Sequence, residues 1–359
     1  MSTETKGKKM SLMSKLKKNS KNPDAEVLSK SQFFEVDIVP IDVPMMNVAL
    51  SGDLDGGLSN GLTVLAGPSK HFKTSFALCM ASSYMKHKPD SVLLFFDTEF
   101  GSPQAYFQQF NIDTDRVFHN PIKNIEELKF ELINQLEQIA KEDDVIIIVD
   151  SIGNSASIKE LEDALSEKSV ADMTRAKALK GLFRMVTPYL AMKNIPMLAI
   201  NHTYKEIGLF PKDIVSGGTG VYYSADNVWI VGRRQNKEGT EVVGYDFVIK
   251  VDKSRFLREN SKIPITVSFD GGIEKYSGLR ELALAGGFIV NPTKGWFQKV
   301  DTTTGEIIEK KIRKKDLDTA EFWDDILELE AFKDFVRGTY MLTGKPTGVD
   351  VVPDEEVVQ

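Results

Sequence analysis

The chain has 359 residues, of which 42% are hydrophobic and 27% charged, a composition typical of a globular protein. Its longest purely apolar run, near 145–149, is far shorter than the roughly 20 residues of a membrane-spanning helix, so we expect no membrane contact. The formal net charge of −7 argues, on its own, mildly against nucleic acid as a partner, although an average hides local charge. The single cysteine, Cys79, excludes an intrachain disulfide.

The N-terminal part is a polar arm with a positive net charge, whereas the chain as a whole has a negative one. Residues 1–24 contain seven lysines against Glu4 and Asp24, which gives a local net charge of +5. The arm lacks the apolar core of a secretory signal, so we expect a cytoplasmic protein. A partly extended stretch interrupted by prolines follows at about 32–50. Solvated, mobile termini remain the alternative to a binding role for both ends of the chain.

From residue 61 onward, short apolar runs alternate with helical patterns. The runs are almost continuously apolar, as expected of strands that are buried on both faces. They lie at 62–66, 91–96, 144–149 and 195–200, and the helical patterns between them lie at about 73–86, 124–140 and 173–193. This alternation predicts βαβ units and a mostly parallel sheet. Later runs at 227–232, 245–251 and 263–269 have no helices between them and predict a more antiparallel edge.

The pattern changes again after about Gly286, where a hairpin-like stretch precedes one or two helices. We therefore predict an α/β protein with a small α+β C-terminal domain. The predicted parts are a basic arm and following segment at 1–45, a core at 46–283, the small domain at 284–345 and an acidic tail at 346–359.

The stretch VLAGPSKHFKTSFAL nearly matches the phosphate-binding pattern G-x-x-x-x-G-K-S/T. Lys73 would contact the β- and γ-phosphates of a nucleotide, and the Thr74 hydroxyl would bind Mg²⁺. Phe72 replaces the second glycine, so we expect it to have a negative φ and a ring packed against protein. A chance match remains the alternative. The candidate nucleotide-binding residues of this loop are Gly67, Pro68, Ser69, Lys70, His71, Phe72, Lys73, Thr74 and Ser75.

Polar side chains follow three further strands of the predicted sheet. Asp97 and Glu99 follow the second run, Asp150 ends the third, and Asn201 and His202 follow the fourth. The carboxyl ends of parallel strands form the usual ligand site of such sheets. Asp150 can therefore hold Mg²⁺, and Glu99 can position and deprotonate an attacking water. Ordinary helix caps are the alternative for each acid taken singly.

The sequence resembles the RecA-type recombinases in six segments that occur in the same order. They are AGPSKHFKTS, DTEFGSPQAY, VIIIVDSIG, AINHTY, a loop ending SGGTG, and KVDKSR. The stretch ALSEKSVADMTRAKALKGLFRMVTPY resembles in particular the UvsX recombinases of tailed bacteriophages. The resemblance covers about 30–345. It implies a RecA-like P-loop ATPase core with a mostly parallel central sheet, and an N-terminal arm that docks on the adjacent subunit.

The resemblance also implies roles for individual residues. Glu99 matches the catalytic glutamate of the family, and Tyr106 matches an aromatic residue that stacks on adenine. His202 stands where RecA has a glutamine that senses the γ-phosphate. Lys253 and Arg255 match cations that reach the ATP of a neighbouring subunit, although exposed strand charges are the alternative for this pair.

Two segments are candidates for DNA binding. Lys177, Lys180 and Arg184 share one face of a predicted helix, opposite an apolar face. A solvated face is the alternative, but the resemblance aligns Lys177 and Arg184 with DNA-contacting arginines of RecA. The segment before this helix, at about 158–172, would then be the first DNA-binding loop, with its acids facing away or contacting a neighbour.

The second DNA-binding loop implied by the resemblance lies at about 203–220, within a long, glycine-rich stretch that we expect to be irregular. The backbone at Gly217, Gly218 and Thr219 would approach phosphates, and Phe210 would wedge between bases.

The resemblance implies an ATP-dependent homologous recombinase that forms a helical filament on single-stranded DNA and exchanges strands with a duplex. It implies ATP and Mg²⁺ as cofactors, with single- and double-stranded DNA, further copies of the chain, a recombinase loader and a single-stranded DNA-binding protein as partners. A hexameric helicase of the same fold and a non-hydrolysing DNA coat protein remain alternatives.

Overall fold

The computed structural model describes residues 11–31, 36–166, 174–206, 208, 211–301, 303–308 and 310–342. The chain forms two compact units, Met1–Asp37 and Ile38–Gln359. In the first unit, helix α1 (Leu12–Asn19) begins at Ser11, whose side chain accepts a hydrogen bond from the Ser14 amide, and a short 3-10 helix, η1, spans Leu28–Lys30. No side chain of α1 is buried.

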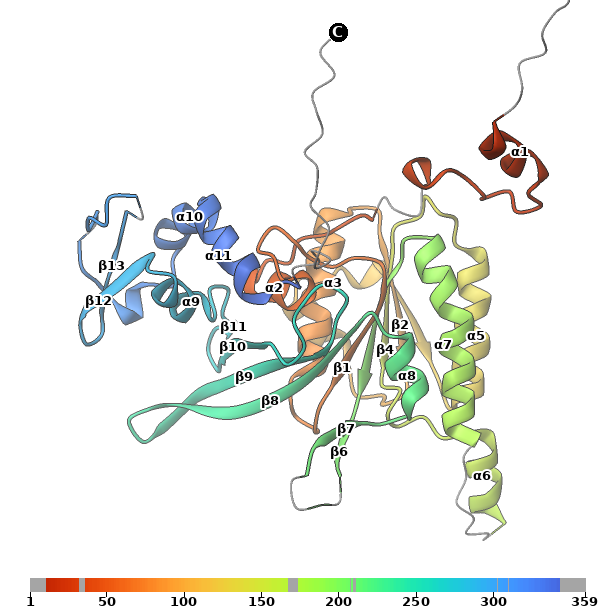
Figure 1. The fold of residues 1–359 in the computed structure, drawn as a ribbon. Coiled ribbons are helices and arrows are strands. Elements are labelled where there is room, and N and C mark those ends of the chain that lie inside the picture. Colours follow the sequence, from red (N-terminus) through yellow and green to blue (C-terminus); the bar gives the residue numbers. More distant parts are fainter. Residues whose placement is uncertain are drawn as a thin grey trace, which may run out of the picture. The chain divides into compact units, whose positions relative to one another are not determined.

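The second unit is built on a nine-stranded sheet with the order β11-β10-β9-β8-β1-β5-β4-β2-β3 (Figure 1). The six strands from β8 to β3 are parallel, whereas β9, β10 and β11 extend the sheet in antiparallel pairing. The predicted mostly parallel sheet with an antiparallel edge is therefore confirmed. The strands are β1 (Gly61–Ala66), β2 (Val92–Asp97), β3 (Val117–Pro121), β4 (Val145–Asp150), β5 (Pro196–Asn201), β8 (Asn227–Glu238), β9 (Glu241–Lys253), β10 (Lys262–Ser268) and β11 (Gly272–Ile273).

Helices cover both faces of this sheet, because successive side chains of a strand point to opposite faces. In β4, for example, Ile146 and Ile148 join one hydrophobic cluster, while Ile147 and Val149 join the other. The first cluster contains α2 (Pro44–Ser51) and α3 (Lys73–His87). The second contains α5 (Ile125–Gln138), α7 (Thr174–Met192) and α8 (Thr219–Ser224). Two short helices, α4 (Gln104–Gln109) and η3 (Thr114–Arg116), connect β2 to β3.

The β8–β9 hairpin is longer than the sequence predicted and extends beyond the neighbouring strands (Figure 1). The expectation of an irregular stretch after β5 was wrong. Strand β6 (Thr203–Lys205) pairs antiparallel with β7 (Asp213–Val215), and α8 follows. The β-branched and aromatic residues of β6 and β7 favour pairing.

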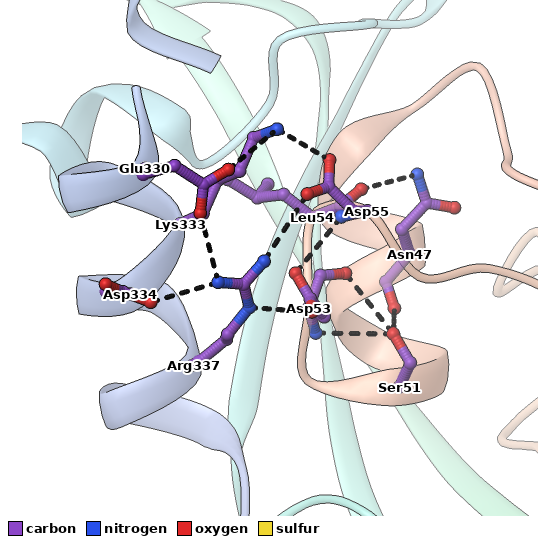
Figure 2. A network of polar contacts seen from close by, with 9 residues as sticks. All are labelled: Asn47, Ser51, Asp53, Leu54, Asp55, Glu330, Lys333, Asp334 and Arg337. Carbon is purple, nitrogen blue, oxygen red and sulfur yellow. Dashed lines mark hydrogen bonds and ion pairs between the residues drawn. The ribbon is translucent and has the colours of Figure 1, made fainter. Parts of the chain in front are cut away.

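The C-terminal elements pack onto the same hydrophobic cluster as α2 and α3, with Trp323 and Phe332 fully buried. They comprise α9 (Leu279–Ala285), a small sheet of β12 (Ile289–Thr293), β13 (Trp296–Lys299) and β14 (Ile312–Arg313), the 3-10 helix η4 (Lys314–Asp316), α10 (Ala320–Glu328) and α11 (Glu330–Tyr340). Figure 2 shows how α11 meets the segment after α2: Arg337 contacts Asp53 and Asp55, and Lys333 also contacts Asp55. Across the described residues, no helix combines the length and apolar character needed to cross a membrane.

Candidate nucleotide and DNA site

The carboxyl ends of four parallel strands surround one cavity of about 360 Å³, a volume typical of small-ligand sites. Residues at or just beyond the ends of β1, β2, β4 and β5 all contribute to it, as expected from the sequence. Its lining consists of Ser69, Lys70, His71, Phe72, Lys73, Thr74, Ser75, Glu99, Tyr106, Asp150, Ile200, His202 and Arg233.

The loop between β1 and α3 has the strand–loop–helix arrangement of a phosphate-binding loop, since Lys73 is the first residue of α3. The Lys73 side chain folds over this loop and its Nζ donates to the Pro68 carbonyl oxygen at 2.8 Å. Burial lowers the pKa of Lys73. The ammonium is therefore held inside the cavity, where an anionic ligand would strengthen its charged form.

The expected negative φ of Phe72 was wrong. Its φ is 55° and its ψ 20°, in the left-handed region that glycine adopts freely. This conformation costs roughly 1–2 kcal/mol for a residue with a Cβ. The ring packs against the hydrophobic cluster, with its centroid 5.2 Å from that of Phe247 on β9, and this contact offsets the strain. The expected packing of the ring against protein is thus confirmed.

Thr74 and Asp150 lie together as a magnesium site requires. The Thr74 hydroxyl donates to Asp150 Oδ2 at 2.8 Å, and Oδ1 is buried without a hydrogen-bond partner among the described residues. Burial raises the pKa of Asp150 to about 6. No group of three or more histidine, cysteine or acidic side chains that could hold a metal occurs in the described parts of the chain. Mg²⁺ needs no such group, because it is commonly bound by one or two protein oxygens, phosphates and water.

Glu99 faces the cavity from the segment after β2, where its Oε1 atom accepts hydrogen bonds from Ser151 Oγ (2.7 Å) and Asn154 Nδ2 (2.9 Å). His202 Nε2 lies 3.3 Å from the same oxygen, at ion-pair distance but without hydrogen-bond geometry. The nearby His202 imidazole, followed by the Ser151 hydroxyl, lowers the pKa of Glu99. The carboxylate is therefore ionised at neutral pH, as a general base must be.

The strand ends are also connected to the elements beyond them. The Asn201 side chain accepts from the His202 amide and donates to the Ser216 carbonyl oxygen at 2.7 Å, just after β7. Gly153 makes room for His202, because a Cβ there would lie 2.5 Å from His202 Cδ2. The Ser216 amide also donates to the His202 carbonyl oxygen at 2.9 Å, so the His202 backbone is joined directly to the segment after β7.

Tyr106 lies on α4 beside the phosphate loop. Its hydroxyl is hydrogen-bonded to Ser75 Oγ, and burial raises its pKa. Tyr106, Phe72 and Ser75 also line an adjoining cavity of about 520 Å³ between α3, α4 and the antiparallel strands. The two cavities thus adjoin one another, and the Tyr106 side chain borders both.

Comparison with known proteins identifies the family. The RecA N-terminal domain matches residues 9–274, and the C-terminal domain of the bacteriophage T4 recombination and repair protein matches residues 276–336. The chain is similar to the recombination and repair protein of Enterobacteria phage T4, with 49% identity over 92% of this chain and 86% of that protein. The chain belongs to the RecA family of recombinases.

Cellular RecA proteins are more distant relatives. Identity is 23% to Protein RecA of Bacteroides thetaiotaomicron, over 82% of this chain and 87% of that protein. It is 24% to Protein RecA of Mannheimia haemolytica, over 67% of this chain and 65% of that protein.

Two cations that the RecA resemblance assigned to ATP binding do not line the cavity of their own chain. Lys253 Nζ donates to the carbonyl oxygens of Tyr222, Tyr223 and Ala225 at the C-terminal end of α8. Burial lowers the pKa of Lys253. Arg255 is largely exposed and forms an ion pair with Asp226 at 2.7 Å. A contact between this pair and ATP would have to involve a different copy of the chain.

The basic face predicted for RecA-type DNA binding is present on α7. Lys177, Lys180 and Arg184 are exposed, and the opposite side of the helix is buried against the sheet. Helix α8 packs closely on α7, because a Cβ at Gly220 would lie 2.7 Å from Lys180 Cβ. Gly217 and Gly218, both with positive φ, lead into α8, whose first residue is Thr219.

The two predicted DNA-binding loops are described only in part. The first is helical as α6 (Ile158–Leu165), and Glu160 caps this helix through the Ser157 amide. The rest of that loop, at 167–172, lies outside the described residues, and so does Phe210 in the second loop.

Two arginines at the site were missed by sequence reasoning. Arg175, at the start of α7, donates to the carbonyl oxygens of Ile152, Gly153 and Ser155 and so fixes the segment after β4. Arg233 lines the cavity from β8 and donates to the Lys70 carbonyl oxygen. Both act on backbone carbonyls of distant segments, for which no sequence pattern exists.

Proposed function

We propose that the protein is an ATP-dependent homologous recombinase that polymerises on single-stranded DNA and exchanges strands with a homologous duplex. The observation that carries this proposal is the convergence of Lys73, Thr74, Asp150 and Glu99 in one cavity, on a fold of the RecA family. Recombinases of this family are in general DNA-dependent ATPases that require Mg²⁺ and form filaments on DNA.

In this proposal each residue has a distinct task. The loop amides and Lys73 hold the β- and γ-phosphates, and Tyr106 stacks on the base. Thr74 and Asp150 would bind Mg²⁺, which neutralises phosphate charge when present. Glu99 orients and deprotonates the attacking water, with its carboxylate held by Ser151 and Asn154. His202, beside Glu99, reports nucleotide state to the segment after β7.

DNA would lie along the basic face of α7 and the backbone at Gly217, Gly218 and Thr219, with Phe210 as a wedge. Lys253 and Arg255 would reach the ATP of the adjacent subunit, so that nucleotide binding and polymerisation support each other. We further propose the division of the chain at 1–45, 46–283, 284–345 and 346–359, with the first part docking on a neighbour. Expected partners are a recombinase loader and a single-stranded DNA-binding protein in the host cytoplasm.

The test is ATP hydrolysis with and without single-stranded DNA, followed by a strand-exchange assay on the same preparation. We expect DNA to stimulate hydrolysis strongly. Lys73→Ala should abolish turnover, because its ammonium binds the reacting phosphates. Glu99→Gln should lower kcat by at least about 100-fold while keeping ATP-stabilised DNA binding, because it removes only the base.

A hydrolysis rate that is already maximal without DNA would refute the coupling between the two sites. A folded Glu99→Gln protein that no longer binds DNA would contradict the role of Glu99 as base. The family match does not favour a closed-ring helicase or a non-hydrolysing coat protein. Duplex unwinding without strand exchange would support the helicase instead.

A further inference from the structure

Arg233 contacts the loop between β1 and α3 from strand β8. It lies on the exposed part of β8, and its Nη1 donates to the Lys70 carbonyl oxygen at 2.8 Å. Its guanidinium also lies over the ring of Tyr245 on β9, 4.5 Å from the centroid. The side chain is therefore fixed between the β8–β9 hairpin and the middle of the loop.

The loop needs such support because it contains two residues in an unfavourable conformation. Lys70 has a φ of 61° and Phe72 a φ of 55°, and neither is a glycine. Residues with a Cβ persist in the left-handed region only when their surroundings hold them there. Phe72 is held by its ring contact with Phe247, and the Lys70 carbonyl is held by Arg233.

Both contacts come from the same hairpin. Phe247 and Tyr245 lie two residues apart on β9, with ring centroids 6.2 Å apart, and Arg233 pairs with Phe247 across the ladder. The loop is thus attached at two points to one rigid two-stranded element, and both points are far from Lys73 in the sequence.

We propose that Arg233 is a positioning residue for nucleotide binding, which keeps the loop amides directed toward the phosphates by holding the Lys70 carbonyl while it stacks on Tyr245. This inference rests on the proposed nucleotide function of the cavity. Arginine suits the task better than lysine, because its planar guanidinium can stack on a ring and donate in its own plane at once.

The experiment measures the affinity for Mg·ATP by calorimetry, without DNA, for the complete protein and its variants. Arg233→Ala should weaken affinity about tenfold, the usual range for losing one charge-assisted hydrogen bond. The KM for ATP should rise by a larger factor than kcat falls, because Arg233 acts through the loop that holds the nucleotide. Tyr245→Leu should reproduce the loss in part, and Arg233→Lys should not restore the parent affinity.

Arg234→Ala is the matched control. Arg234 is the next residue of β8, carries the same charge and pairs with Asp246 rather than with the loop. It should bind ATP like the parent. A second variant tests the strain directly: in a Lys70→Gly background, where positive φ is free, Arg233→Ala should cause a smaller loss than in the parent.

Several outcomes would overturn the inference. Affinity within twofold of the parent for Arg233→Ala would show that the contact has no effect on binding. Full recovery with Arg233→Lys, together with parent-like Tyr245→Leu, would show that Arg233 acts as a charge on the nucleotide instead. A parent protein that binds no ATP would refute the proposed function itself, which is a distinguishable result. Unchanged thermal unfolding of each variant excludes misfolding as the cause.

Discussion

The buried carboxylate of Asp150 is suited to the candidate site, but its ionised form lowers the stability of the fold. Burial raises its pKa from an ordinary 3.8 to about 6, so the folded protein binds this proton more tightly than the unfolded chain. The ionised group therefore destabilises the fold above about pH 6. The destabilisation shrinks as the pH falls from 6 toward 3.8, and it is absent below that value.

We expect Asp150→Asn to raise the free energy of unfolding at pH 7.5, in protein free of nucleotide and Mg²⁺, by on the order of 1–3 kcal/mol. Urea unfolding at pH 7.5 and at pH 4.5 checks this, because most of the gain should vanish at the lower pH. Asp97→Asn is the control: its Oδ1 accepts the Glu99 and Phe100 amides, so it should give no gain. A gain for Asp150→Asn that is equal at both pH values would contradict the argument.

Residues that follow predicted strands could be placed from the sequence, because parallel strands bring their carboxyl ends together. Glu99 and Asp150 were found in this way, and Lys73 and Thr74 were found from the phosphate-binding pattern of the loop after the first run. The backbone of Phe72 could not be, since its conformation depends on a ring contact with Phe247, 175 positions later. The local sequence pattern shows that Phe72 is unusual at its position. Its backbone conformation, however, depends on packing against a residue far away in the sequence.

Helix α11 and the segment after α2 are joined by a cluster of charges (Figure 2). Arg337 Nε donates to Asp53 Oδ2 at 2.8 Å, and its Nη1 donates to Asp334 at 3.0 Å. The hydrogen bond to Asp53 raises the pKa of Arg337, so the guanidinium stays charged. Because both side chains are partly buried, their interaction is less screened than that of a surface pair.

A double-mutant cycle of Arg337→Ala and Asp53→Ala should therefore give a coupling of about 1–2 kcal/mol in urea unfolding. The exposed pair Lys86–Asp42 is the matched control and should give less than about 0.5 kcal/mol. Raising the salt concentration should reduce the control coupling more than that of Arg337. Equal couplings for the two pairs would show that α11 is held by its apolar contacts alone.

Elements with strong periodicity were predicted well, and short ones were not. The apolar runs identified the core strands, and the spacing of Leu179, Leu182 and Val186 identified the buried face of α7. Strands β6 and β7 have three residues each and depend on pairing with one another, which a single sequence does not reveal.

For the molecule as a whole, the net charge has the same sign as the charge of the proposed partner, DNA. The chain carries −7 and is nevertheless expected to follow a polyanion. A filament can resolve this conflict, because each copy adds the same few cations along one path while its acids face elsewhere. Affinity would then depend on a small number of phosphate contacts for each subunit, with α7 as their main source.

We therefore expect Lys177→Ala/Arg184→Ala to weaken binding to single-stranded DNA and to reduce the slope of log affinity against log salt by about 1.4, or 0.7 for each lost contact. Fluorescence anisotropy across a salt series, with a non-hydrolysable ATP analogue, measures both. The variant Lys86→Ala/Lys123→Ala removes the same charge from other exposed positions and should leave the slope unchanged. If both pairs lower affinity equally, net charge rather than the face of α7 governs binding. Electron micrographs should show fewer and shorter filaments for the α7 variant alone, because the affinity of each subunit for the DNA strand limits filament length.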